Sequence, residues 1–107
     1  MERVLYGDVL PYATPTSLHE LHGPDAGVLT LPLHLFWSGL SPDFDLADTD
    51  DLVSAYSAVV REGSAEDQAR YLDRDLLARA WASLRLPVRC RSLWEERFPE
   101  LRALARA

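Results

Sequence analysis

Several residue types and segments that would point to particular functions are scarce or missing. Lysine is absent, and cysteine occurs once, at Cys90, which excludes an internal disulfide framework. The five glycines stand apart from one another, so the sequence contains no glycine-rich loop for a phosphate. No stretch approaches the roughly eighteen apolar residues of a membrane span, and the N-terminus lacks the basic region and apolar run of a signal peptide. We therefore expect a cytoplasmic protein without a cofactor and without membrane contact.

The composition is that of an ordinary globular domain. The chain has 107 residues, of which 48% are hydrophobic and 26% charged, and this is enough to build one core. Prolines and a glycine interrupt the first residues, where no long element can form. We predict a single domain over residues 1–107, with an irregular arm at 1–15 and a compact helical body at 16–107.

Charge is divided unevenly along the chain. Residues 1–69 contain two arginines against twelve acids, a net charge of −10, whereas residues 70–107 contain nine arginines against five acids, a net charge of +4. Such a division indicates a partner-binding surface at one or both ends. The alternative is that the two segments face each other within the fold or in a self-association.

Helix signals dominate the second half of the chain. Asp48, Ser64 and Asp73 are placed to cap three helices, and Pro87 suits the first turn of a fourth. Pro99 ends that helix before a short C-terminal one. The pattern predicts a mainly α fold, with four to five short helices packed around one core. The predicted core residues are Leu52, Tyr56, Val59, Leu77, Trp81, Leu84, Leu93 and Trp94.

One extended segment is expected to lie against these helices. Residues 28–37, VLTLPLHLFW, are rich in β-branched and aromatic residues and lie between two glycines. Pro32 lacks a backbone donor, so the segment should be an edge strand or an irregular one. Its mate would be the Val4–Leu10 arm or a second protein chain. Alternation places five apolar side chains on the core side: Leu29, Leu31, Leu33, Leu35 and Trp37.

Five aspartates then follow within nine residues: Asp43, Asp45, Asp48, Asp50 and Asp51. Asp-x-Asp spacing occurs in calcium loops, but such a loop also needs glycine at its sixth position and glutamate at its twelfth. Counted from Asp43 or from Asp45, neither requirement is met. The favoured interpretation is a turn, a helix cap at Asp48 and acids in the first helical turn. A metal site and an acidic patch for an arginine-rich partner are the alternatives.

The histidines and the cysteine offer weaker candidates for chemistry. His19 and His22 lie on a predicted short helix, which Ser17 caps and Gly23 ends, and His34 could supply a third zinc ligand. Solvated histidines are the simpler interpretation. Cys90 stands between two arginines, which would favour a reactive thiolate, but it also lies on an apolar stripe, where a thiol is inert.

Residues 73–98 have the dimensions of a helix-turn-helix. The segment carries four arginines that are candidates for nucleic-acid contact: Arg85, Arg89, Arg91 and Arg97. Against this, the connection is Arg-Leu-Pro rather than a turn with glycine, and Glu95 and Glu96 lie on the candidate reading helix. A helical hairpin that builds core from two tryptophans explains the same residues.

Several stretches together form a familiar pattern: VLTLPLHLFWSG, FDLADTDDL, AYSAVVREG, YLDRDLLARAW and LRLPVRCRSLWEERFPEL. This series resembles small uncharacterised proteins of high-GC, actinomycete-type bacteria, over roughly residues 25–102. The resemblance implies an antitoxin or accessory role beside a toxin-like partner, such as one of nucleotidyltransferase type. It attaches no catalytic residue to the pattern.

The sequence therefore favours a non-enzymatic, acidic protein-binding module over two other classes of protein. Its candidate site is the aspartate patch, which would cover a basic surface of a protein partner. The unpaired edge of the extended segment could add to a partner sheet. The alternative is a small transcriptional regulator that uses residues 73–98, and a metal-dependent enzyme is the least favoured.

Overall fold

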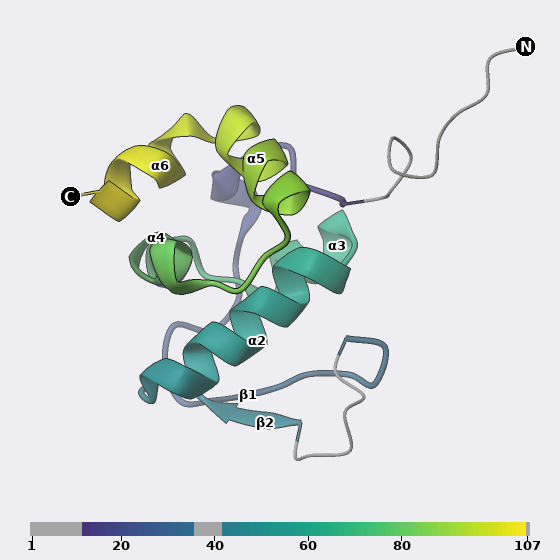
Figure 1. Cartoon of the computed structure of the whole chain (residues 1–107). Coiled ribbons are helices and arrows are strands. Elements are labelled where there is room, and N and C mark those ends of the chain that lie inside the picture. Colours follow the sequence, from purple (N-terminus) through teal and green to yellow (C-terminus); the bar gives the residue numbers. More distant parts are fainter. Residues whose placement is uncertain (1–11, 36–41, 107) are drawn as a thin grey trace, which may run out of the picture.

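The computed structural model describes residues 12–35 and 42–106, and these residues form a mainly α structure (Figure 1). This confirms the predicted fold class. Among the described residues, no helix combines the length and the apolar composition needed to cross a bilayer. The elements, in chain order, are η1 (Leu18–Glu20), β1 (Val28–Thr30), β2 (Asp43–Asp45), α2 (Thr49–Glu62), α3 (Ala65–Tyr71), α4 (Arg74–Ala80), η2 (Trp81–Ser83), α5 (Val88–Arg97) and α6 (Pro99–Arg106).

Helix α2 occupies the centre of the molecule. The two strands lie beside its N-terminal half, and α4, α5 and α6 lie on its other side (Figure 1). Every residue from Ala55 to Val60 is buried, so α2 is covered all round over this stretch rather than along one stripe. Beyond it, Trp94 packs against Trp81 and Phe98 with ring centroids 5.9 and 5.5 Å apart. The hydrophobic core therefore extends from the small sheet to α6.

The helix starts agree with the sequence signals. The carboxylate of Asp48 accepts from the N–H of Asp51, and that of Asp73 accepts from the N–H of Leu76. Ser64 and Asp67 form a reciprocal capping box at α3. These bonds satisfy backbone donors that a helix start leaves unpaired, and they fix where α2, α3 and α4 begin.

The two strands pair with each other, which corrects the expected mate. Strand β1 pairs antiparallel with β2, with Leu29 opposite Phe44, and both of these side chains are buried. The observed mate is thus the aspartate stretch that we interpreted as a turn, and the Val4–Leu10 arm lies outside the described residues. A three-residue strand with acids at both ends is too short to show an alternating pattern.

The extended segment is also shorter than the predicted 28–37. Strand β1 ends at Thr30, and the N–H of Leu35 closes a turn onto the carbonyl of Pro32. This turn breaks the alternation, so Leu33 is 76% exposed rather than in the core, while Leu35 returns to it. Trp37, the last expected core residue of the segment, lies outside the described residues.

The predicted N-terminal helix is a single 3₁₀ turn. Ser17 caps it as expected, but it ends at Glu20 instead of continuing to Gly23. The chain there crosses the end of α3, where the N–H of Gly23 donates to the carbonyl of Leu72 at 2.8 Å. A Cβ on Gly23 would lie 2.4 Å from the carbonyl carbon of Tyr71. Glycine is therefore required for close backbone approach, not for ending a helix.

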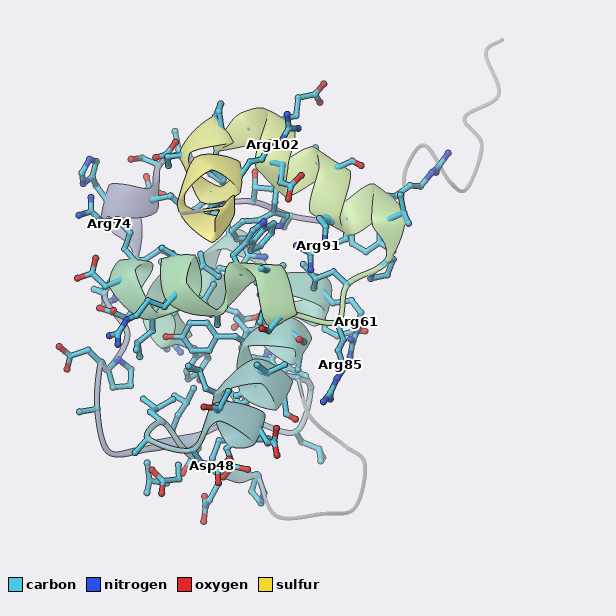
Figure 2. All side chains as sticks on the ribbon, turned by 60° about the vertical axis from the view of Figure 1, so that its left-hand side comes forward. Asp48, Arg61, Arg74, Arg85, Arg91 and Arg102 are labelled. Carbon is cyan, nitrogen blue, oxygen red and sulfur yellow. The ribbon has the colours of Figure 1, made fainter. Side chains whose placement is uncertain are left out.

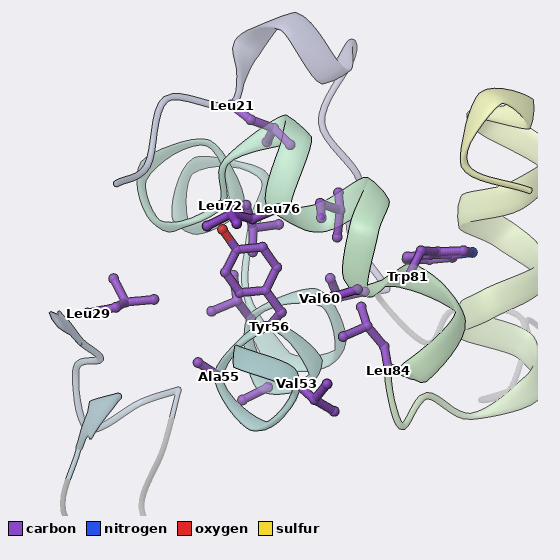
Figure 3. Close-up of a cluster of buried hydrophobic side chains, with 14 of the residues drawn as sticks. Leu21, Leu29, Val53, Ala55, Tyr56, Val60, Leu72, Leu76, Trp81 and Leu84 are labelled. Carbon is purple, nitrogen blue, oxygen red and sulfur yellow. The ribbon is translucent and has the colours of Figure 1, made fainter. Parts of the chain in front are cut away.

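Two neighbouring polar groups of α2 hold both ends of the segment 73–85. The buried Tyr56 hydroxyl accepts from the N–H of Asp73 at 2.9 Å, and the buried Ser57 hydroxyl accepts from the N–H of Arg85 at 2.8 Å. Figure 3 shows the Tyr56 ring between Leu72, Leu76 and Val60. Burial is the main reason that the pKa of Tyr56 lies far above its ordinary value. The two bonds attach α4 and η2 to the centre of the core.

Candidate functional site

Five aspartates gather at one end of the molecule, and we call this surface the acidic end. Its members lie on β2, on the turn after it and in the first turns of α2: Asp43, Asp45, Asp48, Asp50 and Asp51. All are exposed except Asp51, which is partly buried. Figure 2 shows Asp48 at this end, far from Arg91 and Arg102. Asp48 is thus separated in space from these two arginines.

The two aspartates of β2 are held by short local hydrogen bonds. The hydroxyl of Thr30 donates across the ladder to a carboxylate oxygen of Asp43 at 2.7 Å. A carboxylate oxygen of Asp45 accepts from the N–H of Ala47 at 2.9 Å, which closes the turn into α2. Each bond uses one lone pair of one oxygen, and the negative charge stays at the surface.

The aspartates of α2 tie the helix to the sheet. Asp48 accepts from the N–H of Asp51 at 3.0 Å, and Asp51 in turn accepts from the N–H of Asp45 at 2.9 Å. These carboxylates also lie at the positive end of the helix dipole, where negative charge stabilises the helix. The acidic end is therefore a fixed array of charges, in which Asp45, Asp48 and Asp51 accept from backbone N–H groups and Asp43 accepts from the Thr30 hydroxyl.

The three histidines do not converge. The His22 ring bonds to the carbonyl of Glu20, His19 lies 3.4 Å from a guanidinium nitrogen of Arg74, and His34 lies 3.1 Å from a carboxylate oxygen of Asp67. No group of three or more metal-ligating side chains comes together within residues 12–35 and 42–106. The weak zinc candidates thus have three separate environments.

Burial and hydrogen bonding act in opposite directions on the pKa of Asp67. Burial alone would raise this pKa, but hydrogen bonds from the N–H of Ser64, from His34 and from the Ser64 hydroxyl outweigh it. The pKa of Asp67 therefore lies below its ordinary value of 3.8. The ionised Asp67 is part of the capping box, so its charge supports structure rather than chemistry.

The arginine candidates are divided between interior and surface. Arg91 donates to the carbonyl oxygens of Trp81 and Leu84 at 3.1 and 2.6 Å, and its guanidinium lies 5.1 Å from the centre of the Trp81 ring. It therefore joins η2 to α5 and is not a free surface cation. Arg85, Arg89 and Arg97 are exposed. A nucleic-acid contact by residues 73–98 would rest on these three.

A polar cluster that the sequence did not suggest surrounds Glu95. Its carboxylate accepts from the Trp81 indole N–H at 2.9 Å and lies 3.8 Å from Arg91 and 3.5 Å from Arg102. We call these four residues the Glu95 network. They come from η2, α5 and α6, and the Glu95 side chain is only 19% exposed. Glutamate four residues after arginine on one helix was the only signal that could have suggested part of it.

Cys90 is buried, and burial raises the pKa of its thiol to about 11 in spite of the charges of Arg61 and Arg91 nearby. The thiol is therefore protonated at neutral pH, which favours the inert interpretation.

A cavity of about 370 Å³, which no sequence pattern indicated, opens between η1, α4 and α6. One guanidinium and two carboxylates line it, together with two apolar residues: Leu18, Arg74, Asp75, Ala78 and Glu100. This mixture of charges selects no ligand class.

Comparisons with known protein families, with curated proteins and with solved structures found no match to this chain. A function for it has to be argued from its own residues.

Proposed function

We propose that this chain is a non-enzymatic, cytoplasmic protein-binding module that docks through its acidic end onto a basic surface of a protein partner. The observation that carries the proposal is the fixed array of aspartates, in which four of the five carboxylates bond to the sheet, the turn or the start of α2. A surface whose charges are already in place loses little conformational entropy on binding.

The electrostatics favour association with a cation-rich surface. Like charges held close together create a local negative potential, which speeds the encounter with a partner of opposite sign and disfavours acidic partners. The rest of the chain carries the arginine-rich segment, and the acidic end is separated from it in space (Figure 2). A partner is therefore oriented as well as attracted.

The more specific form of the proposal is an antitoxin-like or accessory subunit. A toxin-like enzyme that acts on nucleotides or RNA needs a basic substrate site, and an acidic surface can cover such a site by charge and by bulk.

The test uses three baits on native-host lysate, each with and without nuclease treatment. The first is the unchanged chain and the second is Asp43→Asn, Asp45→Asn and Asp50→Asn together. Asparagine keeps an acceptor oxygen for the turn bonds but removes the charge. The third is a charge-matched control in which exposed acids elsewhere are changed: Glu66→Gln, Glu96→Gln and Glu100→Gln.

We expect one stoichiometric protein on the first and third baits, and its loss from the second. With that protein purified, the triple asparagine variant should associate on the order of tenfold more slowly at low salt. If the partner is toxin-like, the unchanged chain should also inhibit it. Equal retention on all three baits would refute docking by the acidic end. Recovery that disappears on nuclease treatment would favour the regulator that uses residues 73–98.

A further inference from the structure

We propose that the outer edge of β1 accepts an extended, arginine- or lysine-containing segment of the partner as an added antiparallel strand. This inference rests on the proposed function and specifies what part of a partner meets the chain. It follows from the direction of the backbone groups of two residues, Val28 and Thr30.

The register determines which backbone groups face outward. The bonds from Leu46 N–H to Gly27 O and from Leu31 N–H to Pro42 O flank the ladder, with Val28 opposite Asp45 and Thr30 opposite Asp43 between them. In an antiparallel pair, bonded and non-bonded positions alternate. The N–H and C=O groups of Val28 and Thr30 therefore point away from β2, and none of them bonds to a described residue.

The outer edges of the two strands differ in whether their outward backbone groups are hydrogen-bonded. On the outer edge of β2, the N–H of Asp45 is capped by the carboxylate of Asp51 at 2.9 Å. On the outer edge of β1, no described side chain takes that role. Pro32 limits this edge, because it has no N–H and its carbonyl already accepts from Leu35. The open edge thus offers two donors and two acceptors, a short but complete template for one strand.

Exposed apolar side chains accompany the open edge. Val28 is 63% exposed and Leu33, just beyond Pro32, is 76% exposed. An added strand would cover part of Val28 through cross-strand contacts. Edge strands without a partner usually carry charged residues at such positions, and here the residues of β1 itself are uncharged.

Charge selects a basic segment over a second copy of this chain. The side chains of Val28, Thr30, Asp43 and Asp45 share the solvent face of the ribbon. Pairing β1 with β1 of another copy would bring two acidic ends together, which is unfavourable. In an added antiparallel strand, the residues that bond to Val28 and Thr30 place their side chains on this same face. Long basic side chains there can pack their stems on Val28 and direct their charge toward the aspartates.

The test uses a fluorescein-labelled hexapeptide of alternating arginine and valine and two N-methylated versions of it. One version is methylated at the arginine amides and the other at the valine amides, so charge and side chains are unchanged. Binding to the full chain is followed by fluorescence anisotropy. Two protein variants accompany the peptides: Thr30→Pro removes an outward N–H that bonds to no described residue, and Thr30→Val controls for loss of the bond to Asp43.

We expect saturable binding of the parent peptide, at least about tenfold weaker binding of the arginine-methylated version, and a change of less than about threefold for the valine-methylated one. Thr30→Pro should weaken binding about tenfold and Thr30→Val much less. Equal binding of both methylated peptides, or no saturable binding of any peptide, would overturn the added strand. Neither result touches the proposed function, which fails only if the partner is retained equally by the asparagine variant.

Discussion

The acidic end and the Glu95 network use charged side chains in opposite ways. At the acidic end, the bonds of Asp45 and Asp48 join groups only two or three residues apart in sequence, and the charge remains at the surface. In the Glu95 network, one carboxylate joins η2, α5 and α6, and it is largely covered. The bonds of the acidic end leave their carboxylates largely exposed, whereas those of the Glu95 network join three helical elements around a covered carboxylate. Stability and binding should therefore respond to mutation at different ends of the molecule.

The largest loss of stability is expected at the centre of the Glu95 network. Trp81→Ala removes a fully buried ring and should lower the free energy of unfolding by about 3–5 kcal/mol. Val88→Ala, at a residue that is 81% exposed, is the control and should change it by less than about 0.5 kcal/mol. Urea denaturation followed by circular dichroism measures both. A loss below about 1 kcal/mol at Trp81 would contradict its central position.

A smaller loss is expected when the shared carboxylate is removed. Glu95→Ala leaves the buried indole N–H of Trp81 without its acceptor and removes the ion-pair partner of two guanidinium groups, and should cost about 2 kcal/mol of unfolding free energy. Glu96→Ala, one residue later and exposed, should be close to neutral. If both substitutions had the same effect in urea denaturation, the network would not stabilise the fold.

At the acidic end, two substitutions of Asp48 should distinguish the effect of its capping hydrogen bond on stability from the effect of its charge. Asp48→Ala removes the cap of α2 and should cost about 1 kcal/mol of unfolding free energy. Asp48→Asn keeps an acceptor for the N–H of Asp51 and should cost much less. The same denaturation measurements decide between the two. Equal losses would mean that charge, rather than the hydrogen bond, holds the helix start.

The smallest expected effect is a dependence on pH that lies outside both regions, at Asp67. Because its folded pKa is below the ordinary 3.8, its ionised form stabilises the fold above that value. This contribution is lost as pH falls through the folded pKa. Thermal unfolding between pH 5 and pH 2, in about half-unit steps, should therefore show a flatter profile for Asp67→Asn than for the unchanged chain. Identical profiles would exclude this role.

The predictions that were confirmed rest on short-range sequence patterns. The caps at Asp48, Ser64 and Asp73 need only a few neighbouring residues, and the apolar stripe containing Leu77, Trp81 and Leu84 follows the period of a helix. The acidic end could also be located from sequence, since all its members fall within nine residues.

The predictions that failed depended on contacts between distant segments. We did not predict β2 as the mate of β1, because β2 has only three residues and two of them are aspartates, which are uncommon in strands. Gln68 occupies a polar position on a short helix, yet it is fully buried, and its amide donates to the carbonyls of Ala13 and Gly63 at 2.9 and 3.1 Å. Nothing near Gln68 in the sequence indicates that two carbonyls from other segments meet there. Of the three partners of Glu95, only Arg91, four residues before it on the same helix, could have been suggested by the sequence.

The buried thiol of α5 has a practical consequence. Cys90 is the one cysteine in the sequence, and in the folded chain its thiol is covered and protonated. A thiol-specific dye can react with it only after α5 has moved away from the core. The rate of dye incorporation therefore measures how often this part of the molecule opens. Cys90 therefore reports on local opening of the fold without any engineered residue. Its labelling rate can be measured with and without a bound partner.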